Sequence, residues 1–440
     1  MPSQDPEGGS SVASVPEEVT GAPRRVVLGH LHWSNTFVAL RHPNFRLFIS
    51  GQLISLTGTW MQNTAQGWLV YQLTNSKLML GLVAAAGSLP LLVFSVWGGS
   101  LADRHPKRHI VICTQATMML AALTMSLLIW TDRIHVWHIA ALAAVAGLAM
   151  AFDMPARQSF MMEMTSREDL MNAISLNSSI VNGARVVGPS VAGFLMASVG
   201  VGLCFFLNGI SYVAVIAGLW LMRLPKYTPP EPHASTWDHM AEGFRYAWGN
   251  RRIRVMLFLF AIVGTFGWSY SVLMPAFARD VLGVGQGKYG MLLSANGVGA
   301  LLGALTVASA GRQANRRLLV LGGLWIFSGM LLMLALAQSY VLAMLCLAVA
   351  GWGMLLFFST INTLLQTTAS DHMRGRVMGI WALIFGGMTP VGGLMAGALS
   401  HYFGVRWAVS FGALICALTG WVVWMVLPKE PSPVTVPGDP

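Results

Sequence analysis

The amino-acid sequence is dominated by twelve apolar runs, each about as long as an α-helix that crosses a lipid bilayer. Such a helix needs roughly 20 residues at a rise of about 1.5 Å per residue. A soluble domain cannot bury this much apolar surface in one core, since 55% of the 440 residues are hydrophobic and only 10% are charged. We therefore predict an all-α membrane protein with twelve transmembrane helices, at about residues 47–71, 78–101, 110–130, 136–153, 170–198, 203–222, 255–277, 290–309, 318–338, 341–364, 377–399 and 406–427.

Lys and Arg residues are distributed unequally among the loops between these runs. Loops on the cytoplasmic side of a membrane carry an excess of Lys and Arg. Most of the 27 Lys and Arg residues lie in the tails and in every second loop, whereas the alternate loops contain Lys77, Arg133, Arg279, Lys288 and Arg406. This bias predicts a multi-pass protein of the cell membrane, the cell inner membrane, with both termini in the cytoplasm.

The net charge of +10 does not indicate a nucleic-acid partner. The cations form small loop clusters without a basic helix, an arrangement that suits the anionic headgroups of membrane lipid. The sequence contains no Gly-x-x-x-x-Gly-Lys-Ser/Thr motif, so ATP bound to this chain is excluded as the energy source. We predict no cofactor and no metal, because the four cysteines lie inside apolar runs without Cys-x-x-Cys spacing.

The apolar runs fall into two groups of six, separated by a segment that is Pro-rich at its start and charged throughout. A landmark of the first group recurs in the second, since Lys107-Arg108 follows the second run and Arg316-Arg317 follows the eighth. Such duplication is typical of transporters whose two pseudo-symmetric halves rock about a central cavity. The predicted units are a disordered cytoplasmic tail at 1–41, six-helix bundles at 42–222 and 253–428, a cytoplasmic linker at 223–252 and a cytoplasmic tail at 429–440.

The charged loop after the second run reads Gly99-Ser100-Leu101-Ala102-Asp103-Arg104-His105-Pro106-Lys107-Arg108. It resembles the signature that follows helix 2 in the major facilitator superfamily. Three further stretches resemble the branch of that superfamily that holds macrolide exporters and the enterobactin exporter: Phe152-Asp153-Met154-Pro155-Ala156-Arg157-Gln158, Arg167-Glu168-Asp169-Leu170 and Gly188-Pro189. The resemblance extends over about residues 42–427 and implies the major facilitator fold.

The same resemblance implies a secondary active transporter, not an enzyme, that works by alternating access. For this branch it implies proton-driven efflux, an antiport, of a small amphipathic molecule of the drug, macrolide or siderophore class. The partners would then be a small-molecule substrate, the proton and membrane lipid, and we expect a monomer. A lysophospholipid flippase or an importer of the same fold is the alternative.

The resemblance gives the charged loop the role of a conformational latch between the two halves. Asp103 is expected to approach the inner end of the eleventh helix, where exposed N–H groups favour an anion. Lys107 or Arg108 is expected to pair with Asp153. The alternative is that these are charges at headgroup level that only fix the topology. The predicted latch comprises Gly99, Asp103, Arg104, Lys107, Arg108 and Asp153.

Arg185 lies about eleven residues into the fifth predicted helix, roughly 16 Å from its start and close to the bilayer midplane. An unpaired guanidinium costs at least about 2.5 to 3.5 kcal/mol at that depth, where the sequence offers no carboxylate. We expect Arg185 to face the cavity or the interface between the halves, where either neighbouring amides or carbonyls satisfy it or it meets an anionic group of the substrate. The other predicted cavity residues, for which helix packing is the alternative role, are Asn63, Gln66, Trp68, Trp268 and Asn296.

Two further predictions concern movement and coupling. Gly188, Pro189 and Gly193 in the fifth helix partly resemble the glycine-rich antiporter signature and are predicted to act as a hinge. Proton coupling requires a carboxylate or histidine whose proton affinity responds to its surroundings. Asp153 and Asp280 are the acids near a span, and Asp153 is the predicted proton-coupling residue.

Overall fold

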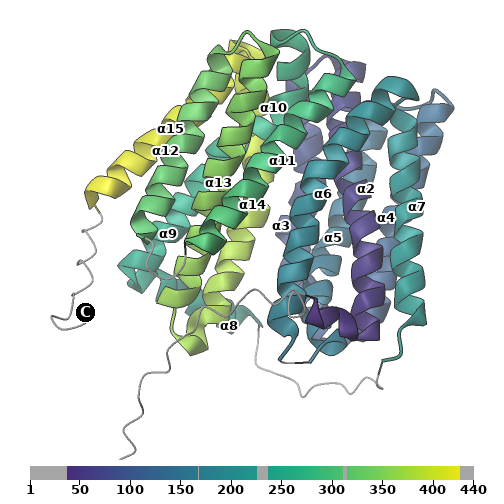
Figure 1. Cartoon of the computed structure of the whole chain (residues 1–440), viewed down its shortest axis with the longest axis vertical. Coiled ribbons are helices and arrows are strands. Elements are labelled where there is room, and N and C mark those ends of the chain that lie inside the picture. Colours follow the sequence, from purple (N-terminus) through teal and green to yellow (C-terminus); the bar gives the residue numbers. More distant parts are fainter. Residues whose placement is uncertain (1–36, 167, 225–235, 311–314, 427–440) are drawn as a thin grey trace, which may run out of the picture.

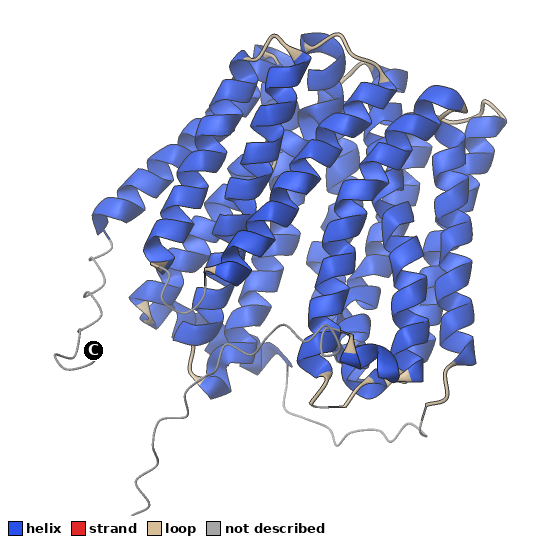
Figure 2. Ribbon diagram, in the orientation of Figure 1, coloured by secondary structure: helices blue, strands red, loops and turns tan. Residues whose placement is uncertain are grey.

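The computed structural model describes residues 37–166, 168–224, 236–310 and 315–426. Within these ranges the chain consists of helices joined by short turns and loops, without a β-strand (Figure 2). The tails predicted at 1–41 and 429–440 and the start of the predicted linker fall largely or wholly outside the described residues. The prediction of an all-α membrane protein is confirmed.

The first bundle occupies one half of the molecule, drawn in purple to teal in Figure 1. Helix α2 packs against both α6 and α7, and α3 and α4 each pack against α5. The elements of this bundle are η1 (Val38–Arg41), α2 (Pro43–Thr74), α3 (Lys77–Arg104), α4 (Lys107–Trp130), α5 (Val136–Met164), α6 (Leu170–Ser198) and α7 (Val201–Leu221).

The second bundle, drawn in teal-green to yellow in Figure 1, repeats this arrangement with one irregular span. Its first span is divided by two π-helical turns, η2 and η3, and contains Pro275 between them. The elements are α8 (Thr236–Gly249), α9 (Arg251–Ile262), η2 (Val263–Gly267), α10 (Tyr270–Ala276), η3 (Phe277–Val281), α11 (Gln286–Ser309), α12 (Arg316–Leu336), α13 (Tyr340–Thr368), α14 (Asp371–Phe403) and α15 (Val405–Val426).

Eleven helices in the described part of the chain are long and apolar enough to cross a membrane. Helix α2 is not among these eleven, although its 32 residues make it one of the longest helices. Its polar residues, among them Gln62, Asn63 and Gln66, lower its mean hydropathy. Because α2 packs between α6 and α7, which are both long and apolar enough to cross a membrane, we assign it as the twelfth span.

The two faces of the molecule are named here by what lies at them. The linker face carries α8, the start of α2 and the end of α3, whereas the far face carries the opposite ends of these two helices (Figure 1). The bundles meet mainly through two helix pairs, α3 with α14 and α6 with α11. Glycines permit close contact there: a Cβ atom on Gly290 of α11 would lie 2.4 Å from the carbonyl oxygen of Pro189 on α6.

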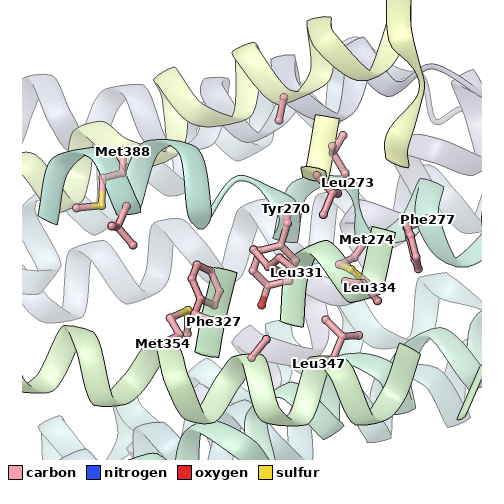
Figure 3. Close-up of a cluster of buried hydrophobic side chains, with 14 of the residues drawn as sticks. Tyr270, Leu273, Met274, Phe277, Phe327, Leu331, Leu334, Leu347, Met354 and Met388 are labelled. Atoms are coloured by element: carbon pink, nitrogen blue, oxygen red, sulfur yellow. The ribbon is translucent and has the colours of Figure 1, made fainter. Parts of the chain in front are cut away.

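The second bundle is held together by a continuous apolar core (Figure 3). Tyr270 and Leu273 of α10 contribute to it with Phe327 and Leu331 of α12, all at most 5% exposed. The rings of Tyr270 and Phe327 lie edge to face with their centroids 6.0 Å apart. This core fixes the irregular span beside α12 and α13.

Two helices differ from the sequence-based expectation. Helix α5 continues to Met164, whereas the hydropathy predicted its end at 153. The later part of the predicted linker at 223–252 forms the amphipathic helix α8. Hydropathy detects the apolar part of a helix, so both a polar extension and a helix lying outside the bilayer escape it.

Candidate functional site

The far ends of the two bundles are joined by a cluster of polar side chains around Asp280. The hydroxyl of Tyr71, on α2, donates to the Asp280 carboxylate at 2.5 Å. The ammonium of Lys77, on α3, lies 3.5 Å from the same oxygen. The guanidinium of Arg279 lies over the Tyr71 ring, 5.7 Å from its centroid. These contacts join the first bundle to η3 of the second and close the far face; we refer to Tyr71, Lys77 and Asp280 as the far-face cluster.

Trp68, one turn before Tyr71 on α2, lies in the same contact zone. Its ring lies 5.3 Å from that of Tyr289 on α11, and only 7% of the residue is exposed. The structure thus places Trp68 between the two bundles in a closed contact rather than at an open cavity. Its predicted role in binding substrate stays a prediction.

The bundles are apart at the linker face, where a cavity of about 440 Å³ lies between α3, α5 and α14. Gly99 and Asp103 of the predicted latch line this cavity from α3, and Gly375 and Arg376 face it from α14. The structure therefore brings Asp103 to the same cavity as the beginning of α14, the helix that it was predicted to approach. Arg104 is exposed at the end of α3.

Asp153 is fully buried within the first bundle. Its carboxylate accepts hydrogen bonds from Thr114 at 2.8 Å and Gln115 at 3.0 Å, both on α4. It also pairs with Arg157, one turn further along α5, at 2.5 Å. Arg157 in turn donates to Gln52 of α2 at 2.7 Å, so this network connects three helices.

The predicted pairing of Lys107 or Arg108 with Asp153 is wrong. Lys107 instead pairs with Glu163 at 2.5 Å, and Arg108 donates to the carbonyl oxygen of Trp220 at 2.9 Å. The reason is the length of α5: because this helix continues to Met164, Glu163 lies level with the start of α4 and Asp153 lies deeper.

Arg185 lies where the two bundles meet. Its guanidinium carbon is 5.7 Å from the ring centroid of Trp60 on α2 and 5.3 Å from that of Trp268. One N–H group donates to the side-chain oxygen of Asn296 on α11 at 3.1 Å. Asn296 is itself fixed, since its amide donates to the hydroxyl of Tyr270 at 2.9 Å.

Most of the N–H donors of Arg185 have no acceptor among the described residues. A guanidinium carries five N–H donors. In the described part of the chain, only Asn296 accepts from Arg185, and no carboxylate pairs with it. Two aromatic faces from different bundles and several uncommitted donors form a site that suits a flat molecule with an anionic group. Three of the predicted cavity residues, Arg185, Trp268 and Asn296, are thus brought together.

The polar residues of α2 divide into two roles. Gln62 accepts a hydrogen bond from Asn208 of α7 at 2.7 Å and therefore joins helices. Asn63 is exposed and Gln66 is half-buried, and neither forms a side-chain hydrogen bond within the described residues. These two predicted cavity residues are accordingly available to a ligand.

The predicted hinge in α6 shows no break in the helix, which runs from Leu170 to Ser198 through Pro189. Its glycines lie at close contacts: a Cβ atom on Gly188 would lie 2.5 Å from the Cβ atom of Trp60, and one on Gly193 would lie 2.9 Å from the carbonyl oxygen of Gly287. Packing against α2 and α11 therefore requires small residues here, and the hinge stays a prediction.

The far-face cluster was missed by the sequence analysis. A signal for it was present, since Lys77 and Asp280 are opposite charges in otherwise apolar surroundings, both at ends of spans that the topology assigns to one side. Their pairing depends on which helices of the two bundles meet, and hydropathy does not contain that information.

Two helical bundles, in contact at one face and separated by a cavity at the other, define a multi-pass membrane protein with the architecture of a transporter. A family profile described as "Transmembrane secretion effector" (MFS_3) matches residues 34–433. The chain belongs to this family of major facilitator superfamily transporters, which confirms the family predicted from its motifs.

The relatives of the chain are transporters rather than enzymes. "Multidrug efflux pump Tap" of Mycolicibacterium fortuitum is 27% identical over 392 residues, covering 87% of this chain and 95% of that protein. "Enterobactin exporter EntS" of Shigella boydii is 26% identical over 383 residues, covering 85% of this chain and 90% of that protein. Among solved structures, a mutant of the nucleoside transporter NupG has a similar fold, with a TM-score of 0.72 at 10% identity, covering 88% of this chain and 99% of that one.

Proposed function

We propose that this transporter is a proton-driven exporter of small amphipathic molecules, with its linker face in the cytoplasm. The orientation is supported by the excess of Lys and Arg in the loops of that face. The observation that carries the proposal is the combination of a closed far face and a cavity of about 440 Å³ at the linker face, which corresponds to the inward-facing state of an alternating-access cycle.

Arg185 and its two Trp neighbours support an amphipathic substrate with an anionic group. The guanidinium offers charge and hydrogen-bond donors, and the rings of Trp60 and Trp268 offer flat apolar contact on either side. Asn63 and Gln66 of α2 add neutral polar groups. The printed names of the relatives, a multidrug efflux pump and an enterobactin exporter, agree with this class of substrate.

The proposed coupling residue is Asp153. Its neighbour in sequence, Met154, lines the linker-face cavity together with Pro155, so the buried Asp153 lies one residue along the chain from the lining of that cavity. Protonation of Asp153 would neutralise the partner of Arg157 and release its side chain, which also bonds to Gln52 of α2. A proton is thereby linked to the packing of α5 against α2, the helix that carries the cavity residues.

The latch residue Asp103 is proposed to hold the linker face closed in the other state of the cycle. When the linker face closes, Asp103 and the beginning of α14 approach each other across the space that the cavity now fills. Asp103 then accepts from the N–H groups at the start of α14, a contact that a helix N-terminus favours for an anion. Because this contact forms only when the linker face is closed, it shifts the equilibrium between the two conformations toward the closed one.

Accumulation in cells, measured with and without a proton uncoupler, tests the proposal. Cells that express the chain should accumulate less of an anionic amphipathic probe than cells that express the Arg185→Gln variant, and the uncoupler should abolish the difference. Probes from the macrolide, catechol siderophore and lysophospholipid classes distinguish a drug or siderophore exporter from a flippase. Higher accumulation in the expressing cells would identify an importer and overturn the proposed direction.

A further inference from the structure

Helix α8 presents two opposite faces, of which one is attached to α14. The Glu242 carboxylate pairs with Arg376 at 2.6 Å, and Gly243 packs against the side chain of Arg376. One turn further along, the Tyr246 hydroxyl accepts from the backbone N–H of Ser370 at 3.2 Å. Glu242 and Tyr246 are four residues apart and share this side of the helix. The attachment falls on the first turns of α14, which line the linker-face cavity.

The opposite face of α8 is aromatic and is bordered by basic residues. Phe244 is 43% exposed and Trp248 is 72% exposed, and the two are again four residues apart. Arg245, on α8, and Arg251 and Arg252, at the start of α9, are all exposed. Because α-helical residues advance about 100° each, positions 244 and 248 point away from positions 242 and 246.

Arg254 extends this surface and orders it. Its guanidinium lies over the Trp248 ring, 5.7 Å from the centroid, and donates to the Trp248 carbonyl oxygen at 2.7 Å. We define the α8 patch as Phe244, Arg245, Trp248, Arg251, Arg252 and Arg254. Between positions 241 and 254 Glu242 is the single acid, and its carboxylate is paired with Arg376.

The charge and the position of the patch identify its occupant. Helix α8, which carries the patch, lies at the linker face beside the N-terminal end of α14, where the spans of the second bundle begin (Figure 1). Exposed aromatic rings at helical spacing insert into the boundary between headgroups and acyl chains, and clustered Arg residues attract anionic headgroups. Each Arg near an anionic membrane surface strengthens association about fivefold.

We infer that the α8 patch binds the headgroups of anionic phospholipid in the adjacent leaflet and thereby holds the beginning of α14 through Glu242 and Tyr246. Two observations carry this inference: the exposed aromatic and basic face, and the ionic and hydrogen-bonded attachment of the other face to α14. The consequence is that the lipid composition of the leaflet sets how freely α14 moves at the cavity. Only this consequence rests on the proposed function; the binding surface does not.

Native mass spectrometry of the purified full chain with phosphatidylglycerol and phosphatidylcholine tests the binding. The wild type should retain phosphatidylglycerol in preference to phosphatidylcholine. In the triple variant R245Q/R251Q/R252Q the ratio of retained phosphatidylglycerol to phosphatidylcholine should fall at least tenfold. In R245K/R251K/R252K most of this preference should remain. The matched control R41Q/R46Q/R223Q removes three exposed arginines of the same face from the first bundle and should behave as the wild type.

Equal retention of the two lipids by the wild type, or an unchanged preference in R245Q/R251Q/R252Q, would overturn the inference. So would a wild-type dimer that becomes a monomer in this variant, because the patch would then bind a second copy of the chain. Uptake of the anionic probe into vesicles of each lipid tests the consequence: phosphatidylglycerol, which holds α14, should lower the wild-type rate several-fold relative to phosphatidylcholine and leave the rate of the triple variant unchanged. If the wild type transports nothing in either lipid, the proposed function fails while the binding result stands.

Discussion

Replacing Asp280 by Asn should shift the transporter from the far-face-closed state toward the far-face-open state. The carboxylate accepts from Tyr71 at 2.5 Å and lies 3.5 Å from the ammonium of Lys77, and both partners belong to the other bundle. Asn keeps the size and an acceptor but removes the charge. These contacts exist only while the far ends of the bundles meet, so their loss affects one state of the cycle alone.

The change in the conformational equilibrium can be estimated from the two contacts of Asp280, the hydrogen bond from Tyr71 and the ion pair with Lys77. A charge-assisted hydrogen bond is about twice as strong as a neutral one, so neutralising the acceptor costs roughly 1 to 1.5 kcal/mol. The Lys77 pair is partly exposed, with side-chain exposures of 25% and 33%, and contributes about 0.5 to 1 kcal/mol after solvent screening. A total of about 2 kcal/mol changes the equilibrium roughly 30-fold, which raises an open population of about 1% to about a quarter.

Electron paramagnetic resonance distances across the far face measure this population directly. Spin labels at Arg133 in the first bundle and Gln338 in the second occupy exposed positions at that face. Cys113 is the exposed native cysteine of the described residues and would be replaced first. A second, longer distance should appear in Asp280→Asn but not in the control Lys288→Gln, whose ammonium lies over Tyr340 within the second bundle. An unchanged distance distribution in Asp280→Asn, or an equal change in the control, would refute the reasoning.

Three further predictions concern the interior. Arg185→Gln should reduce export of an anionic amphipathic probe at least tenfold, and that of a neutral probe little, in the accumulation assay. Asp153→Asn leaves Arg157 without its buried partner and should cost about 3 kcal/mol of stability, whereas the double variant with Arg157→Gln should recover part of it; thermal unfolding measures both. Gly290→Ala places a Cβ atom 2.4 Å from the Pro189 carbonyl oxygen and should loosen the contact of α6 with α11, measured as a longer far-face distance between the same spin labels.

The helical architecture was predictable because hydropathy is a local property of the sequence. The predicted runs at 110–130 and 170–198 fall within or coincide with α4 and α6. The charge pairs were not predictable to the same extent. Asp153 pairs with Arg157, one turn further along the same helix, and this local pair was hidden because hydropathy ended the run at 153 while α5 continues to Met164. The pair of Lys107 with Glu163 depends on how α4 packs beside α5, which no local window contains.

The candidate site shows the same division. Arg185 was identifiable from the sequence alone, since a charge at mid-span requires an explanation. Its two flanking rings come from α2 and from the residue after η2, which only the packing of one bundle on the other brings together. Helix α8 was hidden because a helix that lies outside the bilayer has no long apolar run.

The π-helical turn η2 allows the position of Trp268, beside Arg185, to change. A π turn accommodates about one residue more than an α turn, so a return of η2 to regular α geometry would rotate Trp268 by roughly 100° about the helix axis. The indole that now covers one side of Arg185 would swing away from it. The space beside Arg185 can thus be widened or narrowed by a change of register within a single helix, independently of the rigid-body motion of the bundles.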